Sequence, residues 1–261
     1  AGCAAAIGNN TTGVSGPGWH TSVMWVRVSN LASGSASLSD ILEGARWAAD
    51  HGAKVVSTSY TGVQNASVGT TGTYIRSQGG IYCYAAGNFN VNWSSFDYPD
   101  VIVVGATDES DAKAGFSGYG TAIDAVAPGT NILSTYVSQT YTTLSGTSMA
   151  TPILNGVLAL IWSVNPSFTP EQVEGFLFDG CVDLGDPGDD NIFGRGRIDA
   201  FASVQLAITA LGPQTPVAGD DAAGTIEGFP TLSDVLANDT DPNSDPVTIA
   251  SFDAVSVNGG T

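Results

Sequence analysis

The chain has 261 residues, of which 43% are hydrophobic and 12% are charged. This balance predicts a globular protein with a large core, because disorder needs low hydrophobicity and many charges. Seven Lys and Arg residues against 25 Asp and Glu residues give a net charge of −18, which opposes binding to nucleic acid and to anionic membrane surfaces. No apolar run reaches the roughly 20 residues that cross a bilayer, so we expect no transmembrane segment.

Four short apolar runs predict strands that are covered on both faces, as in a parallel sheet. They lie at residues 22–28, 53–57, 80–85 and 101–104. Apolar spacing predicts a helix over residues 40–50, with Asp40 and Glu43 at capping-box spacing and Gly52 as its C-terminal stop. This helix and the first two strands form a predicted βαβ unit.

Three further helices are expected at residues 148–164, 170–178 and 198–211, the second of them beginning at Pro170. Helices that alternate with buried strands indicate an α/β fold with a mostly parallel central sheet and helices on both faces. Cys3, Cys83 and Cys181 are too scattered for a disulfide framework or a metal-binding CxxC motif, and we interpret them as core residues.

The composition changes after Leu211. Residues 212–216 read Gly-Pro-Gln-Thr-Pro, and the chain from there to Thr261 contains no Lys, Arg, Cys, Trp or Tyr. We therefore predict one domain over residues 1–211, a linker over 212–219 and a second, partial all-β module over 220–261. The chain opens at Ala1 without an initiator Met or a signal peptide, so we expect a piece of a longer protein and draw nothing about export from the missing signal.

The sharpest chemical signal is a turn of small residues that enters a long apolar helix at Ser148. A serine at a helix N-terminus is surrounded by unpaired N–H groups that favour developing negative charge. A serine that only caps the helix, with no role in catalysis, is the alternative at this position. No histidine follows Ser148, which excludes the Ser-Asp-His order of α/β-hydrolases, whereas the subtilisin order places its histidine before the serine.

Residues 146–152 read Gly-Thr-Ser-Met-Ala-Thr-Pro and resemble the nucleophile motif of the subtilisin-like serine peptidases. Upstream, residues 85–88 read Ala-Ala-Gly-Asn and resemble the family's A-[AS]-G-N segment. Other motifs follow in the family's order at residues 98–99, 101–106, 116–117, 127–129 and 194–200. The resemblance covers about residues 1–210.

This resemblance implies a serine endopeptidase that forms an acyl-enzyme on Ser148, with the side-chain amide of Asn88 in the oxyanion hole. It also implies that Thr61 narrows the substrate pocket, because the family usually has glycine there. The substrate-binding residues that it implies are Ser59, Tyr60, Thr61, Gly62, Ala86, Gly87 and Thr147.

The family's catalytic His precedes the position of Ala1 by a few residues and its catalytic Asp lies farther upstream, so we expect both to lie outside this chain. His20 and His51 are interpreted as surface histidines. In the helix after the nucleophile, Asn155 replaces a usual alanine. The resemblance therefore implies a polar amide that faces the core and needs a hydrogen-bond partner.

The chemistry requires no cofactor, and a structural calcium ion is left open. The loop at residues 7–14 resembles the family's calcium loop, with Asn10 as a ligand, but Gly8 looks like an insertion and an upstream acidic ligand is absent, so its metal ligands stay unknown. The acidic clusters at residues 183–190 and 238–245 have oxygen atoms suited to calcium, and a solvated acidic loop is the alternative for each.

Residues 234–242 resemble the opening of the cadherin-like tandem repeats found in bacterial surface and secreted proteins. This second resemblance implies that residues 220–261 begin one β-sandwich repeat of a protein that is secreted or at the cell surface. The resemblance to the peptidases implies polypeptides as the substrates. The alternative function is a non-catalytic surface or adhesion protein on a degenerate peptidase scaffold. The presence of both Ser148 and Asn88 argues against that alternative.

Overall fold

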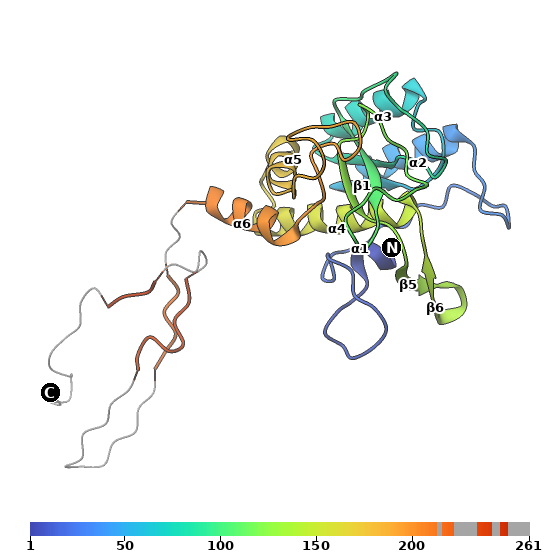
Figure 1. Ribbon diagram of the computed structural model, residues 1–261. Coiled ribbons are helices and arrows are strands. Elements are labelled where there is room, and N and C mark those ends of the chain that lie inside the picture. The colour runs from blue at the N-terminus through green and yellow to red at the C-terminus, as the bar shows by residue number, and fades with distance from the viewer. Residues whose placement is uncertain (213–215, 222–233, 242–245, 250–261) are drawn as a thin grey trace, which may run out of the picture. The chain divides into compact units, whose positions relative to one another are not determined.

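The computed structural model describes residues 1–212, 216–221, 234–241 and 246–249 (Figure 1). The chain forms two compact units, Ala1–Ala207 and Ile208–Thr261, which are treated separately below. Residues 213–215 of the predicted linker and most of the predicted second module lie outside the described residues.

A four-stranded parallel sheet forms the centre of the first unit. Its strands lie in the order β1 (Val55–Thr58), β2 (Ile81–Ala85), β3 (Val101–Thr107) and β4 (Ala125–Pro128). The register pairs Val55 with Ile81, Tyr82 with Val101, and Val104 with Ala125. β2 and β3 are buried along their whole length, as their near-continuous apolar runs predict.

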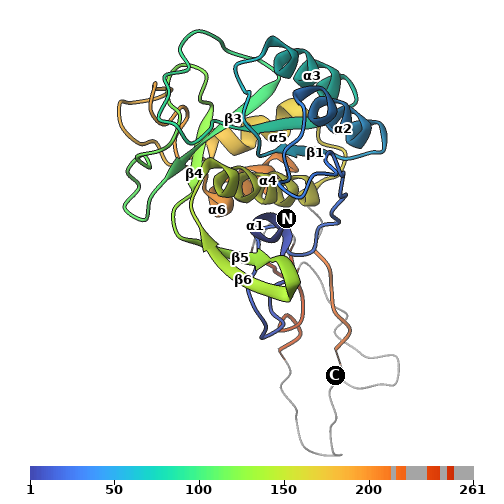
Figure 2. The same ribbon diagram turned by 90° about the vertical axis from the view of Figure 1, so that its right-hand side faces the viewer.

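Helices cover both faces of this sheet (Figure 2). On one face, α2 (Leu38–Asp50) and α3 (Ala66–Ser77) pack with Tyr82 and Tyr84 in a shared core. On the other face, α4 (Thr147–Val164) contacts all four strands and also packs against α5 (Pro170–Asp179). The predicted α/β class, with a parallel sheet and helices, is confirmed.

The helix boundaries follow local capping chemistry. The Ser37 side chain accepts a hydrogen bond from the Asp40 N–H at 3.1 Å, so Ser37 is the N-cap of α2 and the predicted capping box at Asp40 is wrong. α5 has a full capping box between Thr169 and Gln172. The last helix, α6 (Ala200–Ala210), is shorter than the predicted helix at 198–211. The first unit ends within it, at Ala207.

One predicted strand is wrong. Residues 22–28 have no strand partner among the described residues, although their sequence is as apolar as that of β1. A strand is defined by its ladder of hydrogen bonds, and without that ladder Val23, Met24 and Trp25 remain exposed. The predicted βαβ unit therefore lacks its first strand, and only its helix, α2, and its second strand, β1, are present.

A hairpin that the sequence patterns did not predict lies beside α4. β5 (Ile132–Tyr136) and β6 (Thr140–Leu144) form an antiparallel hairpin around the 3₁₀ turn η1 (Val137–Gln139). The short helix α1 (Gly2–Ala5) lies between this hairpin and α4 (Figure 2). The first residues of the chain thus lie close to the start of α4.

α4 is the one helix among the described residues that is long and apolar enough to cross a membrane, with a mean hydropathy of 1.4. Its contacts with all four strands and with α5 are those of a core helix, and 56% of it is buried.

The three cysteines are free thiols. Cys83 is buried, and Cys3 and Cys181 are partly exposed.

In the second unit, the described residues form one antiparallel bridge. Val217 and Thr240 exchange two backbone hydrogen bonds of 2.7 and 3.0 Å. The Gly219 N–H donates to Asp239 Oδ1 at 2.7 Å, and Asn238 Nδ2 donates to the Asp220 carbonyl at 3.0 Å. The predicted β-sandwich stays a prediction.

Candidate active site

Ser148 is the second residue of α4, where the hairpin returns to the carboxyl end of the sheet. The turn before it is fixed by a 2.7 Å hydrogen bond from the Gly146 N–H to the Gly129 carbonyl, just beyond β4. Ser148 is half-buried, and its Oγ lies 3.5 Å from the Ser59 carbonyl, at the limit of a hydrogen bond. The hydroxyl therefore has only a weak partner.

Asn88 follows β2 and is held by Thr147. The backbone N–H and the Oγ1 hydroxyl of Thr147 donate to Asn88 Oδ1 at 2.8 and 2.9 Å. The Gly87 N–H in turn donates to Thr147 Oγ1 at 3.0 Å. Because two donors fix the amide oxygen, the Nδ2 group is turned away from Thr147, and it has no hydrogen-bond partner among the described residues.

Two glycines allow this close approach. A Cβ atom on Gly146 would lie 3.0 Å from Asn88 Nδ2, and one on Gly129 would lie 2.5 Å from the Ala106 Cβ. A side chain at either position would push the turn away from the sheet. Gly146 in the motif at 146–152 and Gly129 in the motif at 127–129 are therefore needed because there is no space for a side chain at either position.

Two N–H donors are available beside the Ser148 hydroxyl. One is the Asn88 amide, and the other is the backbone N–H of Ser148, which lies in the first turn of α4 where helices provide no carbonyl partner. Donors that are fixed before reaction stabilise the negative charge that develops on an attacked carbonyl oxygen. The arrangement is suited to acyl transfer through Ser148.

The segment from Ser59 to Gly62 leads away from Ser148 beyond the end of β1. Ser59 Oγ donates to the Ser148 carbonyl at 3.3 Å, and the Tyr84 hydroxyl donates to the Thr61 carbonyl at 3.0 Å. Burial raises the pKa of Tyr84 to about 12, so this hydroxyl stays protonated as a donor. Gly62 has a positive φ of 108°, which suits glycine.

Ala86 is fully buried, and its N–H and carbonyl are both paired, with the Val104 carbonyl and the Trp93 indole N–H. Gly87 follows with a φ of 89°. Hydrogen bonds thus join Ser59 to Ser148, and they join Thr147 to Asn88 and Gly87. Tyr60 and Thr61 are bonded instead to the Gly34 carbonyl and the Tyr84 hydroxyl, and no contact with Ser148 is described for Gly62 or Ala86. Sequence patterns missed the anchoring role of Tyr84; its position two residues after Tyr82 in a buried strand was the available signal.

A cavity of about 210 Å³ lies directly beside Ser148. It is lined by the first three residues of the chain, by the β5–β6 hairpin and by Met149. His20 and His51 are both exposed, and among the described residues neither has a hydrogen bond or ring contact with Ser148. The His51 Nδ1 atom instead lies 2.8 Å from the Trp47 carbonyl, one helical turn back on α2.

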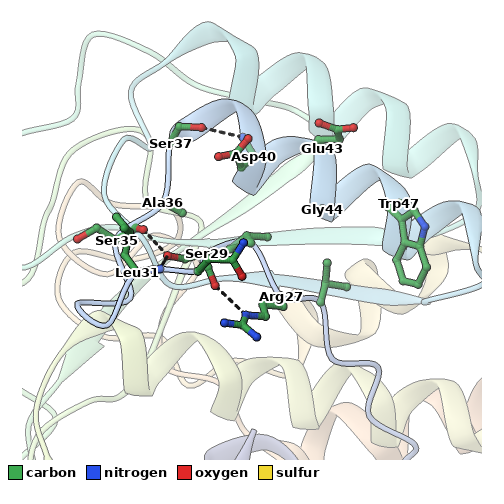
Figure 3. Close-up of a pocket in the computed structure, with 13 residues that line it drawn as sticks. Arg27, Ser29, Leu31, Ser35, Ala36, Ser37, Asp40, Glu43, Gly44 and Trp47 are labelled. Carbon is green, nitrogen blue, oxygen red and sulfur yellow. Dashed lines mark hydrogen bonds between the residues drawn. The ribbon is translucent and has the colours of Figure 1, made fainter.

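A larger cavity, of about 790 Å³, lies between residues 26–31 and α2 (Figure 3). Arg27, Asp40, Glu43 and Trp47 are among its lining residues, and none of the predicted site residues lines it. The cavity is thus separate from Ser148.

The candidate calcium ligands are engaged in backbone hydrogen bonds. Asn10 Oδ1 accepts from the Thr12 N–H, Asp183 accepts from the Gly188 N–H, and Asp190 accepts from three backbone N–H groups of its own loop. Among the described residues, no group of three or more His, Cys, Asp or Glu side chains could hold a metal ion. The predicted cluster at 238–245 lies partly outside the described residues.

Asn155 is 7% exposed on α4, and in the described part of the chain neither its Oδ1 nor its Nδ2 atom has a hydrogen-bond partner. The amide therefore faces the core as predicted. The partner that such a group needs is not among the described residues.

A parallel α/β core with a serine and two fixed N–H donors at the start of its central helix defines a serine-hydrolase type of site. Residues 1–196 match the family model described as the subtilase family. The chain belongs to the subtilase family.

Two relatives and one solved structure are similar to this chain. The chain is 37% identical to thermitase from Thermoactinomyces vulgaris over 78% of this chain and 73% of that protein. It is also 37% identical to the M-protease from Shouchella clausii, but the match spans about half (53%) of that protein. A solved protease structure from Pseudoalteromonas arctica PAMC 21717 is 31% identical, with a TM-score of 0.70 over 79% of this chain and 69% of that one.

Proposed function

We propose that this protein is a serine endopeptidase that hydrolyses peptide bonds through an acyl-enzyme on Ser148. The observation that carries the proposal is the fixed Asn88 amide, whose oxygen accepts two hydrogen bonds from Thr147 while its Nδ2 group remains available. The membership of the subtilase family and the protease names of its relatives support the same activity.

In the proposed reaction, Ser148 Oγ attacks the carbonyl carbon of the scissile peptide bond as its proton passes to a general base. The carbonyl oxygen becomes an oxyanion and accepts hydrogen bonds from Asn88 Nδ2 and the Ser148 N–H. The C–N bond then breaks, and the base returns the proton to the leaving amine. Water repeats the sequence on the acyl-enzyme and frees Ser148.

We propose that the base is a histidine, oriented by an aspartate, in a segment that precedes Ala1. Two observations support this. Neither His20 nor His51 contacts Ser148 among the described residues, and Ala1, Gly2 and Cys3 line the same cavity as Ser148. Residues 1–261 alone are then expected to hydrolyse no peptide, because a serine hydroxyl without a base is a weak nucleophile.

For the remainder of the chain we propose a linker over residues 212–219 and the start of a cadherin-like repeat over 220–261, in a protein that is secreted or at the cell surface. The chemistry needs no cofactor, and a structural calcium ion remains a proposal. Limited proteolysis followed by mass spectrometry tests the linker. Cleavage between Leu211 and Asp220 that releases an intact first unit is expected, and cleavage inside the first unit before that point would contradict the boundary.

The test of the activity is proteolysis of an unfolded protein substrate by the full-length protein and by its Ser148→Ala variant. The matched control is Ser163→Ala, because Ser163 is an exposed serine farther along α4. We expect Ser148→Ala to lose all but a trace of activity and Ser163→Ala to keep it. Equal activity of both variants would reject Ser148 as the nucleophile.

A further inference from the structure

The backbone that carries Asn88 is paired, on both sides of that residue, with a segment that follows β3. The Gly118 N–H donates to the Gly87 carbonyl at 3.0 Å, and the Asn90 N–H donates to the Phe116 carbonyl at 2.8 Å. These two hydrogen bonds enclose Asn88 in the sequence. The position of its backbone therefore depends on where the partner segment lies.

A lysine side chain ties these two segments together. Lys113 Nζ donates to Asn90 Oδ1 at 2.9 Å, to the Ser117 carbonyl at 3.2 Å and to the Ala114 carbonyl at 3.3 Å. An ammonium group has three N–H donors, so these three oxygen atoms can use all of them. The connection lies two residues from Asn88, the candidate oxyanion donor.

The backbone of Lys113 is anchored to the central sheet. Lys113 forms an antiparallel bridge with Thr107, the last residue of β3, and the next N–H, that of Ala114, donates to the Ala106 carbonyl at 2.9 Å. The Ala106 N–H in turn donates to Oγ of the fully buried Ser117 at 3.0 Å. The ammonium group therefore extends from a backbone that the sheet already fixes.

Asn90 depends on the lysine more than the lysine's other partners do. It is exposed and has a φ of 53°, in the left-handed region that asparagine adopts more readily than most residues. Among the described residues, the bond from Lys113 is the one hydrogen bond of the Asn90 side chain. Without the ammonium, the described hydrogen bonds of Asn90 reduce to that of its N–H with Phe116.

The two lysines of the chain differ in their surroundings. Lys113 is half-buried, its Nζ atom lies 5.4 Å from the centre of the Tyr119 ring, and burial lowers its pKa because the charge loses contact with water. Lys54 is exposed, and the hydrogen bond described for it is a 3.4 Å contact with the Gly79 carbonyl. Only Lys113 thus combines partial burial with a set of three oxygen partners.

We propose that Lys113 is a positioning residue for the candidate oxyanion hole, whose ammonium fixes the backbone around Asn88 and thereby the direction of the Asn88 Nδ2 group. The proposal rests on the proposed function of Ser148, because that reaction is what uses this donor. Thr147 holds the amide oxygen of Asn88 from α4, and Lys113 holds the backbone from the end of β3. A donor that is less well fixed stabilises the transition state less.

The first test compares Lys113→Met, which removes the donors but keeps a long side chain, with Lys54→Met as the control. Steady-state kinetics of the full-length protein on a peptide substrate measure both. We expect Lys113→Met to lower kcat by about tenfold with little change in KM, and Lys54→Met to change neither. Asn90→Gly removes the acceptor from the other side and suits the positive φ, so it should lower kcat similarly.

A double-mutant cycle shows whether Lys113 acts through Asn88. In a protein that already carries Asn88→Ala, Lys113→Met should lower kcat by less than about twofold, because the donor that it positions is gone. A purely structural role of Lys113 would lower kcat equally in both backgrounds. An equal loss in both, or an unchanged kcat of Lys113→Met alone, would overturn the proposal.

Amide hydrogen exchange separates this role from the proposed function. Lys113→Met should speed exchange of the Asn90 N–H by about tenfold with β2 unchanged, and Lys54→Met should leave both unchanged. Unchanged exchange at Asn90 would overturn the positioning role even if kcat fell. If the unaltered protein cleaves no peptide, the proposed function fails and the catalytic part of this role falls with it, while exchange still shows whether Lys113 fixes the backbone.

Discussion

The two ends of the central sheet use polar side chains in opposite ways. At the amino end, the Arg76 guanidinium on α3 pairs with Asp100, just before β3, and with Glu171 and Glu174 on α5. At the carboxyl end, the Asn88 Nδ2 group has no hydrogen-bond partner in the described part of the chain, and the Ser148 hydroxyl has one weak partner there.

The difference separates groups that hold the fold from groups that remain available for chemistry. Arg76 is largely buried and links α3, the start of β3 and α5, so its charge is neutralised by ion pairs within the fold. Burial raises the pKa of Glu174 above its usual value although Arg76 lowers it, because the carboxylate is largely removed from water. At the carboxyl end the donors are uncharged, so they can be left unpaired at the partly exposed surface at lower cost.

The largest effect that would test this contrast is on catalysis. We expect Asn88→Ala to lower kcat by about 10² to 10³ with little change in KM, a magnitude taken from the corresponding experiment on subtilisin itself, because the donor acts mainly in the transition state. Steady-state kinetics on peptides measure it, with Asn165→Ala as a control far along the chain. A loss confined to KM would show that Asn88 does not bind the oxyanion.

A substitution at the amino end of the sheet should lower the stability of the protein and leave its catalysis unchanged. Arg76→Leu leaves the partly buried Glu174 without its partner, so we expect the free energy of unfolding to fall by about 3 kcal/mol. Urea titration measures it, and kcat of the folded protein should stay unchanged. Arg195→Leu is the control, since Arg195 pairs with Asp189 at the surface and such pairs contribute less than about 1 kcal/mol. Similar losses in both variants would refute the structural role of Arg76.

A smaller effect is expected from Thr147, which acts through Asn88. Thr147→Val removes the hydroxyl that donates to Asn88 Oδ1 and accepts from Gly87, so the amide is less firmly oriented. We expect kcat to fall by about tenfold, the value of one lost hydrogen bond of roughly 1.4 kcal/mol, and Thr147→Ser to restore it. If serine fails to restore kcat, the hydroxyl is not what orients Asn88.

The smallest effect concerns the pocket rim. The Thr61 side chain is exposed, and Phe89, which follows Asn88 in the sequence, is 75% exposed. We expect small or medium apolar residues to be preferred before the scissile bond, and Thr61→Gly to raise kcat/KM for a large aromatic residue severalfold relative to alanine. An unchanged ratio would remove Thr61 from the pocket.

The contrast between β1–β3 and residues 22–28 shows what sequence patterns predict. Both are apolar runs, yet only the former have neighbouring strands among the described residues. An apolar run predicts burial, but the ladder partner is set by distant parts of the chain. α3 was missed for a different reason: its glycines lower helix propensity, and Gly72 is needed because a Cβ there would lie 2.4 Å from Val101 Cγ2.

The candidate site was predictable where its residues form compact motifs. Ser148, Thr147 and Gly146 are consecutive, and Asn88 follows a buried strand. The bonds from Tyr84 to Thr61 and from Tyr60 to Gly34 join residues 23 and 26 positions apart. No local pattern encodes such pairs, because they depend on how segments that are distant in the sequence pack together in the fold.

The most direct measurement of the central claim is labelling with a fluorophosphonate, which reacts with activated serines, followed by peptide mapping. Full-length protein, residues 1–261 alone, and full-length variants at Asn88, His20 and His51 are compared. The account predicts rapid labelling of Ser148 in the full-length protein, slower labelling in Asn88→Ala, and little in residues 1–261. Labelling of another serine, or rapid labelling of residues 1–261 that His20→Ala or His51→Ala abolishes, would contradict it.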